Sequence, residues 1–130
     1  MRKLAVGCTL LSMGLLIGTK LWAHHGPGAY DRSQAVTVTG SVTRFDFINP
    51  HVLIYVAVDS NDGSQEIWSG ELTSPNRLAR MGSGVRWHKD LLKPGDVISL
   101  TGSPARNGAP VILLSRVEDD AGNVLTASGR

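Results

Sequence analysis

The first long alternating segment of the chain changes the face on which its apolar side chains fall. Val36, Val38 and Val42 share one face of a predicted strand, with hydroxyl-bearing residues between them on the other face. After Val42 the phase is reversed, because Phe45 and Phe47 take the apolar positions. A strand exchanges its buried face in this way only through a bulge or a sharp bend. Bends of this kind are needed to close a barrel.

The rest of the chain contains further short strand patterns separated by turns. The second strand is apolar on both faces, which predicts a central position, and Asn61-Asp62-Gly63 predicts a tight hairpin after it. The predicted strands after the first are residues 51–59, 65–72, 96–102 and 110–117, followed by a turn at 119–123 and a short tail strand. A short helix is predicted after the third strand, with Ser74 as its cap, Pro75 at its first position and Gly82 at its end.

This order of elements predicts an all-β fold, a five-stranded OB-like barrel with one short helix between strands three and four. Three strands, the helix and two strands follow one another within about 85 residues. A small β-sandwich is the competing architecture. Six prolines and fifteen glycines among 130 residues agree with a fold rich in turns.

Residues 1–23 have the features of a secretory signal peptide. Arg2 and Lys3 give a basic start, an apolar stretch follows to Gly18, and Ala23 precedes a plausible cleavage site. An uncleaved anchor is the alternative, but the apolar stretch is shorter than the ~20 residues that span a bilayer. We therefore predict an exported protein, periplasmic or secreted, with residues 24–34 as an N-terminal arm and 35–127 as the barrel domain.

Cleavage would change the charge and the chemistry of the chain. Three of the 13 basic residues lie in the leader and all 11 acidic residues lie outside it, so the mature charge becomes −1 instead of +2. A large basic surface for nucleic acid is therefore not expected. Cys8, the one cysteine, would also be removed, leaving no disulfide and no thiolate ligand, and no transmembrane span is expected in the mature form.

The histidines suggest a metal site. Cleavage after Ala23 would make His24 the first residue, so that its α-amine and its imidazole can chelate one ion. Copper(II) favours nitrogen-rich tetragonal sites, and an α-amine with a pKa of ~7.7–8.0 loses its proton readily to a metal. His51 is the best remote third donor, and His25 is an alternative ligand on the same arm. The candidate cofactor is copper.

Each of these residues also has a simpler interpretation. The arm around His24 and His25 is also compatible with a disordered or interacting segment, and a structural or interaction role is the favoured interpretation. Asn49-Pro50 forms a rigid corner before the second strand, and His51 there is interpreted as bonding a nearby backbone carbonyl. Glu71 is a candidate supporting carboxylate for a ligand, although a solvent-facing strand carboxylate is favoured.

Signatures of enzymes are missing from the sequence. It has no nucleophile elbow, no phosphate-binding loop with lysine and no His-Glu-x-x-His helix, so a non-enzymatic binding protein is predicted. Trp68 is predicted to lie in the core, and the position of Trp87 is left open. The basic residues around the helix, Arg77, Arg80, Arg86 and Lys89, are interpreted as a solvated face.

Several short motifs, in this order, resemble a family of small exported bacterial proteins of unknown function. They are His24-His25, Asn49-Pro50-His51-Val52, Ser74-Pro75 with Leu78, Arg80 and Gly82, Leu92-Lys93-Pro94-Gly95-Asp96, and Pro104-Ala105-Arg106-Asn107-Gly108. One departure is Ser83, where that family often has an aromatic residue. The resemblance implies an exported OB-like barrel and supplies no activity. The alternative to a metal protein is thus an OB-like module that binds a protein, a glycan or another small ligand.

Overall fold

The computed structural model describes residues 26–82 and 84–127 of the chain. His24 and His25, and the predicted leader, lie outside the described residues. The described elements are a 3₁₀ helix η1 (Pro27–Ala29), the strands β1 (Val36–Asp46), β2 (Leu53–Asp59) and β3 (Gln65–Glu71), the helix α1 (Pro75–Arg80), and the strands β4 (Val97–Pro104), β5 (Val111–Asp119) and β6 (Val124–Ala127).

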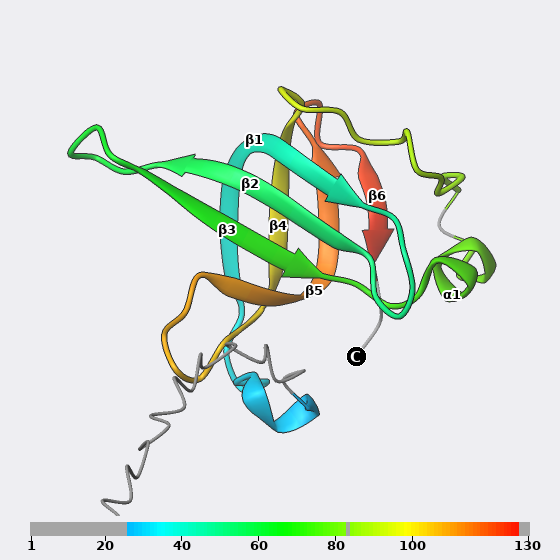
Figure 1. The fold of residues 1–130 in the computed structure, drawn as a ribbon, viewed down its shortest axis with the longest axis horizontal. Helices are drawn as coiled ribbons and strands as arrows, with labels where there is room; N and C mark the ends of the chain where they lie inside the picture. Colours follow the sequence, from blue (N-terminus) through cyan, green and yellow to red (C-terminus); the bar gives the residue numbers. More distant parts are fainter. Residues whose placement is uncertain (1–25, 83, 128–130) are drawn as a thin grey trace, which may run out of the picture.

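Five of the strands close into a barrel (Figure 1). Neighbouring strands follow the order β3-β2-β1-β4-β5-β6, and an additional parallel pairing between β3 and β5 joins the two sides. β6 pairs with β5 alone, beyond the part of β5 that contacts β3. This arrangement, with α1 between β3 and β4, confirms the predicted OB-like barrel.

The bend predicted in the first strand is present. β1 pairs with β4 from Val36 to Ser41 and with β2 from Ser41 to Asp46, and its register with β2 shifts between Val42 and Arg44. The extra residue at this bulge lets Val42 and the later phenylalanines pack toward the same interior, as the change of phase indicated. β1 therefore pairs with β4 through its first half and with β2 through its second half.

The core lies inside the barrel and extends under the long loop after α1. Alternate residues of β2 and the residue before it are buried, as are two residues of β4. These are Val52, Ile54, Val56, Ile98 and Leu100. Trp87, from the loop, is also buried, and its Nε1–H donates to the carbonyl of Leu125 at 3.2 Å.

Trp68 differs from its prediction as a core residue. It is only partly buried, packs against the edge of the core, and donates from Nε1 to Glu66 at 2.9 Å. The reason is the position of Trp68 in β3. The parallel pairing with β5 covers β3 only from Ser69 to Glu71, so the preceding part of β3 has a strand neighbour on one side only.

α1 follows β3 and lies beside the end of the barrel toward which β3 runs (Figure 1). Leu78 is its buried residue, and Gly82 follows the helix with a φ of 63°, a conformation that favours glycine. Ser74 occupies the N-cap position as expected, but its backbone carbonyl, and not its side chain, accepts the first helical hydrogen bonds. Among the described residues no helix is long and apolar enough to cross a membrane.

Candidate functional site

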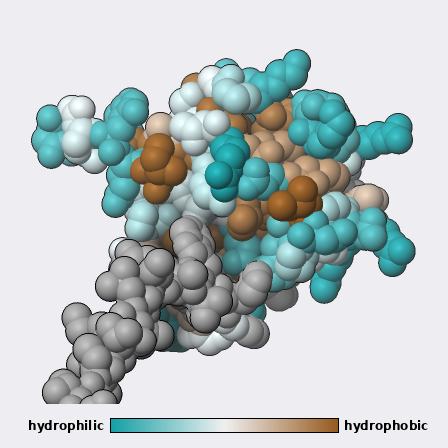
Figure 2. Space-filling view, viewed as in Figure 1, coloured by the Kyte–Doolittle hydropathy of each residue, from teal (hydrophilic) through white to brown (hydrophobic). Residues whose placement is uncertain are grey.

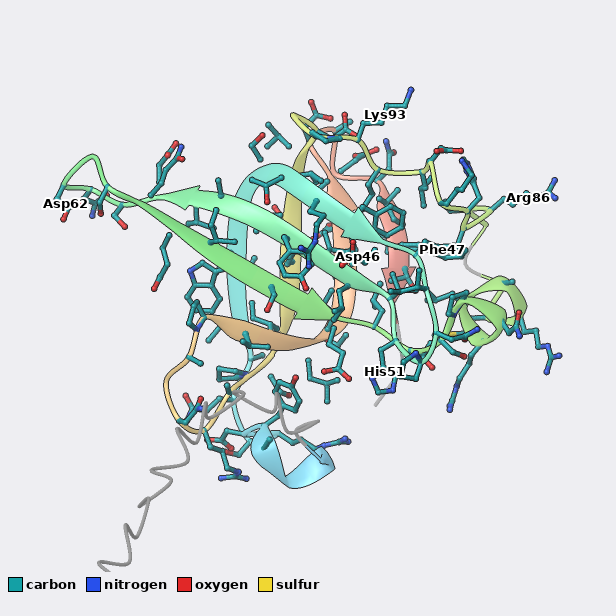
Figure 3. All side chains as sticks on the ribbon, viewed as in Figure 1. Asp46, Phe47, His51, Asp62, Arg86 and Lys93 are labelled. Atoms are coloured by element: carbon teal, nitrogen blue, oxygen red, sulfur yellow. The ribbon has the colours of Figure 1, made fainter. Side chains whose placement is uncertain are left out.

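A hydrogen-bonded group of three side chains lies at the end of the barrel where β3 runs toward α1. Nδ1 of His51 lies 2.5 Å from Oε1 of Glu71, and the hydroxyl of Tyr30 donates to Oε2 of the same carboxylate at 2.8 Å. Both oxygens of Glu71 are therefore engaged. Figure 3 shows His51 at this end of the barrel, next to the chain that leads into α1.

The register of β2 against β3 explains why His51 meets Glu71. Leu53 is the direct partner of Glu71, and the pairing continues beyond β2 through hydrogen bonds of Val52 with Leu72 and Thr73. His51 lies two residues before Leu53 and so projects from the same face, diagonal to Glu71. Two interpretations made from the sequence are thus wrong: the partner of His51 is a carboxylate, and Glu71 is mostly shielded from solvent, with 19% of its side chain exposed.

The arm reaches this group through Tyr30. The backbone of Tyr30 forms a bridge with Ala105, and hydrogen bonds on either side join Asp31 to Pro104 and Arg106 to Ala29. The Tyr30 side chain is buried, and this burial, followed by the hydrogen bond and charge of Glu71, raises the pKa of the Tyr30 hydroxyl above its ordinary value. The phenol therefore remains a hydrogen-bond donor to Glu71 across the physiological range of pH.

The three side chains form part of the wall of a pocket of about 360 Å³. The pocket lies between the arm, the end of β3, α1 and β5, with Thr126 of β6 beside it. Its apolar wall comes from leucines of β5 and of the α1 region together with a methionine: Leu72, Leu78, Met81, Leu113 and Leu114. Arg32 and Arg77, both exposed, contribute the cationic part of the lining.

The ring of His51 presents its second nitrogen away from Glu71. A carboxylate at Nδ1 favours the tautomer in which Nδ1 carries the proton, which leaves the lone pair of Nε2 available to a ligand. The His51 side chain is 48% exposed, so an incoming group has access to it. This is the arrangement that a histidine metal ligand requires.

The sequence-predicted metal residues are divided between described and undescribed parts of the chain. His51 lies in the described region, whereas His24 and His25 do not. Within residues 26–82 and 84–127 no group of three or more His, Cys, Asp or Glu side chains is placed to hold a metal ion. His88 is exposed in the loop, where its Nδ1 accepts a hydrogen bond from the backbone N–H of Asp90.

Two residues of this site were not found from the sequence. Tyr30 and Arg32 belong to a polar, glycine-rich arm, and nothing in that segment's pattern indicates that it returns to the barrel. One signal was available for Tyr30, because a lone aromatic residue in a polar arm is a common anchor for such a segment. Arg32 carries no comparable signal.

Comparison with known proteins gives a family but no activity. No curated protein matches the chain. Among solved structures, the mitochondrial single-stranded DNA binding protein Rim1 of S. cerevisiae is similar, with 9% sequence identity, a TM-score of 0.47, and coverage of 73% of this chain and 96% of that one. A family model described as a family of unknown function, DUF6152, matches residues 14–113. Because this match covers most of the chain, the protein belongs to that family.

Proposed function

We propose that this protein is exported to the periplasm and binds a metal ion, with copper as the specific candidate, through its mature N-terminus and His51. In this proposal the α-amine and imidazole of His24 supply two nitrogen donors and Nε2 of His51 supplies the third. His25 either replaces His24 as the imidazole donor or orients the arm. The role is that of a metal carrier and not of an enzyme.

The observation that carries this proposal is the contact between Glu71 and Nδ1 of His51. A carboxylate bonded to the rear nitrogen of an imidazole fixes its tautomer and its orientation toward a ligand at the other nitrogen.

The anchoring of the arm supports the participation of the N-terminal histidines. Tyr30 and His51 contact the same carboxylate, so the arm is held beside His51. His24 precedes Tyr30 by six residues, of which Pro27–Ala29 form η1, so this segment spans less than the ~20 Å of a fully extended chain. The proposal requires the residues before η1 to turn back toward His51.

Copper(II) titration of the protein purified after native export tests this proposal. Mass spectrometry of the periplasmic product first establishes whether His24 is the N-terminal residue. We expect one copper ion per chain, and an electron paramagnetic resonance spectrum with nitrogen couplings. Adding one N-terminal alanine, or replacing His51 in His51→Ala, should each weaken binding by about tenfold or more.

His88→Ala is the matched control, because it removes an exposed histidine far from the proposed site in the sequence and should leave copper affinity unchanged. Tight binding that is indifferent to His51→Ala would reduce the site to a terminal histidine chelate and would contradict the proposal. Cleavage at another position would contradict the role of His24 directly.

The second candidate is an OB-like interaction module that binds a protein or glycan without a metal. The β2–β3 hairpin supports it, since it projects beyond the barrel (Figure 1), and Ile67 near its end is 49% exposed. Its tip, by contrast, is hydrophilic (Figure 2). An extra N-terminal alanine should not affect binding of such a partner, whereas Ile67→Glu should weaken it.

A further inference from the structure

The pocket beside His51 has features that the metal proposal does not use. Its volume of about 360 Å³ is near the lower end of the range found for small-molecule sites. Five apolar side chains form one part of its wall, and two arginines lie in the other. A ligand that fills this space would therefore need both an apolar body and a polar head.

The charged residues around the pocket indicate which sign of charge the polar head of a ligand would carry. The single acidic residue of the lining, Glu71, has both oxygens occupied by His51 and Tyr30. In the described part of the chain, neither Arg32 nor Arg77 forms an ion pair with a carboxylate. The pocket thus carries uncompensated positive charge.

We infer that this pocket binds a small amphipathic carboxylate, with its apolar body against Leu78, Met81 and Leu113 and its carboxylate beside Arg32 and Arg77. A guanidinium binds a carboxylate through two parallel hydrogen bonds, and burial of an apolar chain contributes in proportion to the area removed from water. This inference does not depend on the proposed metal site, although His51 and Glu71 contribute to both.

Octanoate is the probe for the first experiment, and octan-1-ol, which has the same chain without the charge, is the matched ligand. Binding is measured by calorimetry and by amide chemical shifts of the exported protein in the presence of EDTA. We expect octanoate to shift the amides of Leu113, Ser115 and Thr126, and to bind about tenfold or more tightly than octan-1-ol.

Variants of surface arginines distinguish octanoate binding in the pocket from nonspecific attraction of octanoate to positive charge. Arg77→Gln and Arg32→Gln should each weaken octanoate binding several-fold and together by about tenfold or more. Arg80→Gln is the control, since Arg80 belongs to the same helix but does not line the pocket, and it should bind octanoate as the unmodified protein does.

Equal binding of octanoate and octan-1-ol would overturn the inference, and so would equal losses from Arg80→Gln and Arg77→Gln or shifts confined to another surface. The form with one extra N-terminal alanine should bind octanoate normally. This measurement distinguishes failure of the metal site, which the extended form loses, from failure of the carboxylate pocket, which it keeps.

Discussion

Tyr30 and Glu71 are separated by 41 residues in the sequence and are joined by a hydrogen bond of 2.8 Å between hydroxyl and carboxylate. This bond connects the N-terminal arm to the third strand of the barrel. It also occupies the oxygen of Glu71 that does not face His51. The position of the arm and the orientation of the histidine therefore depend on the same carboxylate.

Removing the hydroxyl in Tyr30→Phe should destabilise the protein while preserving the packing of the ring. A hydrogen bond to a charged acceptor contributes about 1.5–3 kcal/mol, so we expect a loss near the lower end of this range in the free energy of unfolding. Urea denaturation measures it. Tyr55→Phe is the control, because no hydrogen bond of the Tyr55 hydroxyl is found within the described residues, and its effect should stay within about 0.5 kcal/mol. Equal losses from the two variants would contradict the assignment.

The stability of the protein should fall in strongly alkaline solution because of Tyr30. The folded state raises the pKa of this phenol, so above about pH 10, the ordinary tyrosine value, the unfolded chain loses a proton that the folded chain retains. The contribution is complete below that pH and is lost progressively as the pH rises from there toward the higher pKa of the folded state. Unfolding free energies measured from about pH 8 to pH 11 should decline more steeply for the unmodified protein than for Tyr30→Phe. Parallel curves would show that Tyr30 does not retain its proton on folding.

Gly102→Ala should strongly destabilise the barrel. A Cβ atom at this position would lie 2.8 Å from Cγ2 of Ile112 and would also collide with the carbonyl of Leu113. Because one of these neighbours is backbone, relief requires the two strands to move apart, and overpacking of this kind costs about 1–3 kcal/mol. Gly28→Ala serves as the control, since nothing lies within 4 Å of a Cβ there. Thermal denaturation of the two variants checks the difference, and equal midpoints would show that β4 and β5 are less closely packed than described.

The two tryptophans of the barrel should differ in their contributions to stability. Trp87 is 4% exposed and packs against Phe45, with 6.2 Å between ring centroids, so Trp87→Ala should cost about 3–5 kcal/mol. Trp68→Ala should cost less than half as much, because Trp68 is only partly buried. Denaturation by urea, followed by circular dichroism, compares them. A larger loss of unfolding free energy for Trp68→Ala than for Trp87→Ala would support the core position that the sequence predicts for Trp68.

Glu71→Gln should weaken copper binding without removing a proposed ligand. The amide keeps the size of the side chain but loses the charge that holds the proton of His51 on Nδ1, and changes of this kind reduce metal affinity about 10–100-fold. Copper titration at constant pH measures the effect. Glu66→Gln, on the exposed half of the same strand, should leave the affinity unchanged. An unaltered affinity in Glu71→Gln would separate Glu71 from the metal proposal.

The parts of the fold that could be predicted depend on local patterns. The bend near Val42, the hairpin ending at Gly63 and the helix beginning at Pro75 each follow from a few neighbouring residues. The order of these elements was then sufficient to select a barrel. Strand ends were less accurate: β2 begins at Leu53 and not at His51, because the bend at Asn49-Pro50 leaves His51 outside the regular ladder.

The candidate site could be predicted only by its individual residues. His51 was identified from its place after Asn49-Pro50, and Glu71 was considered as its possible support. Their contact depends on the register of β2 against β3, which no short segment specifies. The contribution of Tyr30 depends on the return of the arm to the end of β4, a tertiary event without a signature in the arm itself.

β5 has a different strand neighbour, on the side away from β4, at each of its two ends. Its beginning, Val111–Leu113, runs beside β3, and its later part, Arg116–Glu118, runs beside β6. The pocket opens between β3 and β6 at the middle of β5, where Leu114 and Ser115 line it. The arm and α1 complete the wall of this opening, so its width depends on the stagger of the strands together with the position of the arm. Insertions in the β2–β3 turn, which contributes no lining residue, should leave the opening intact, whereas insertions in the β4–β5 turn, which holds Tyr30 in place, should alter it.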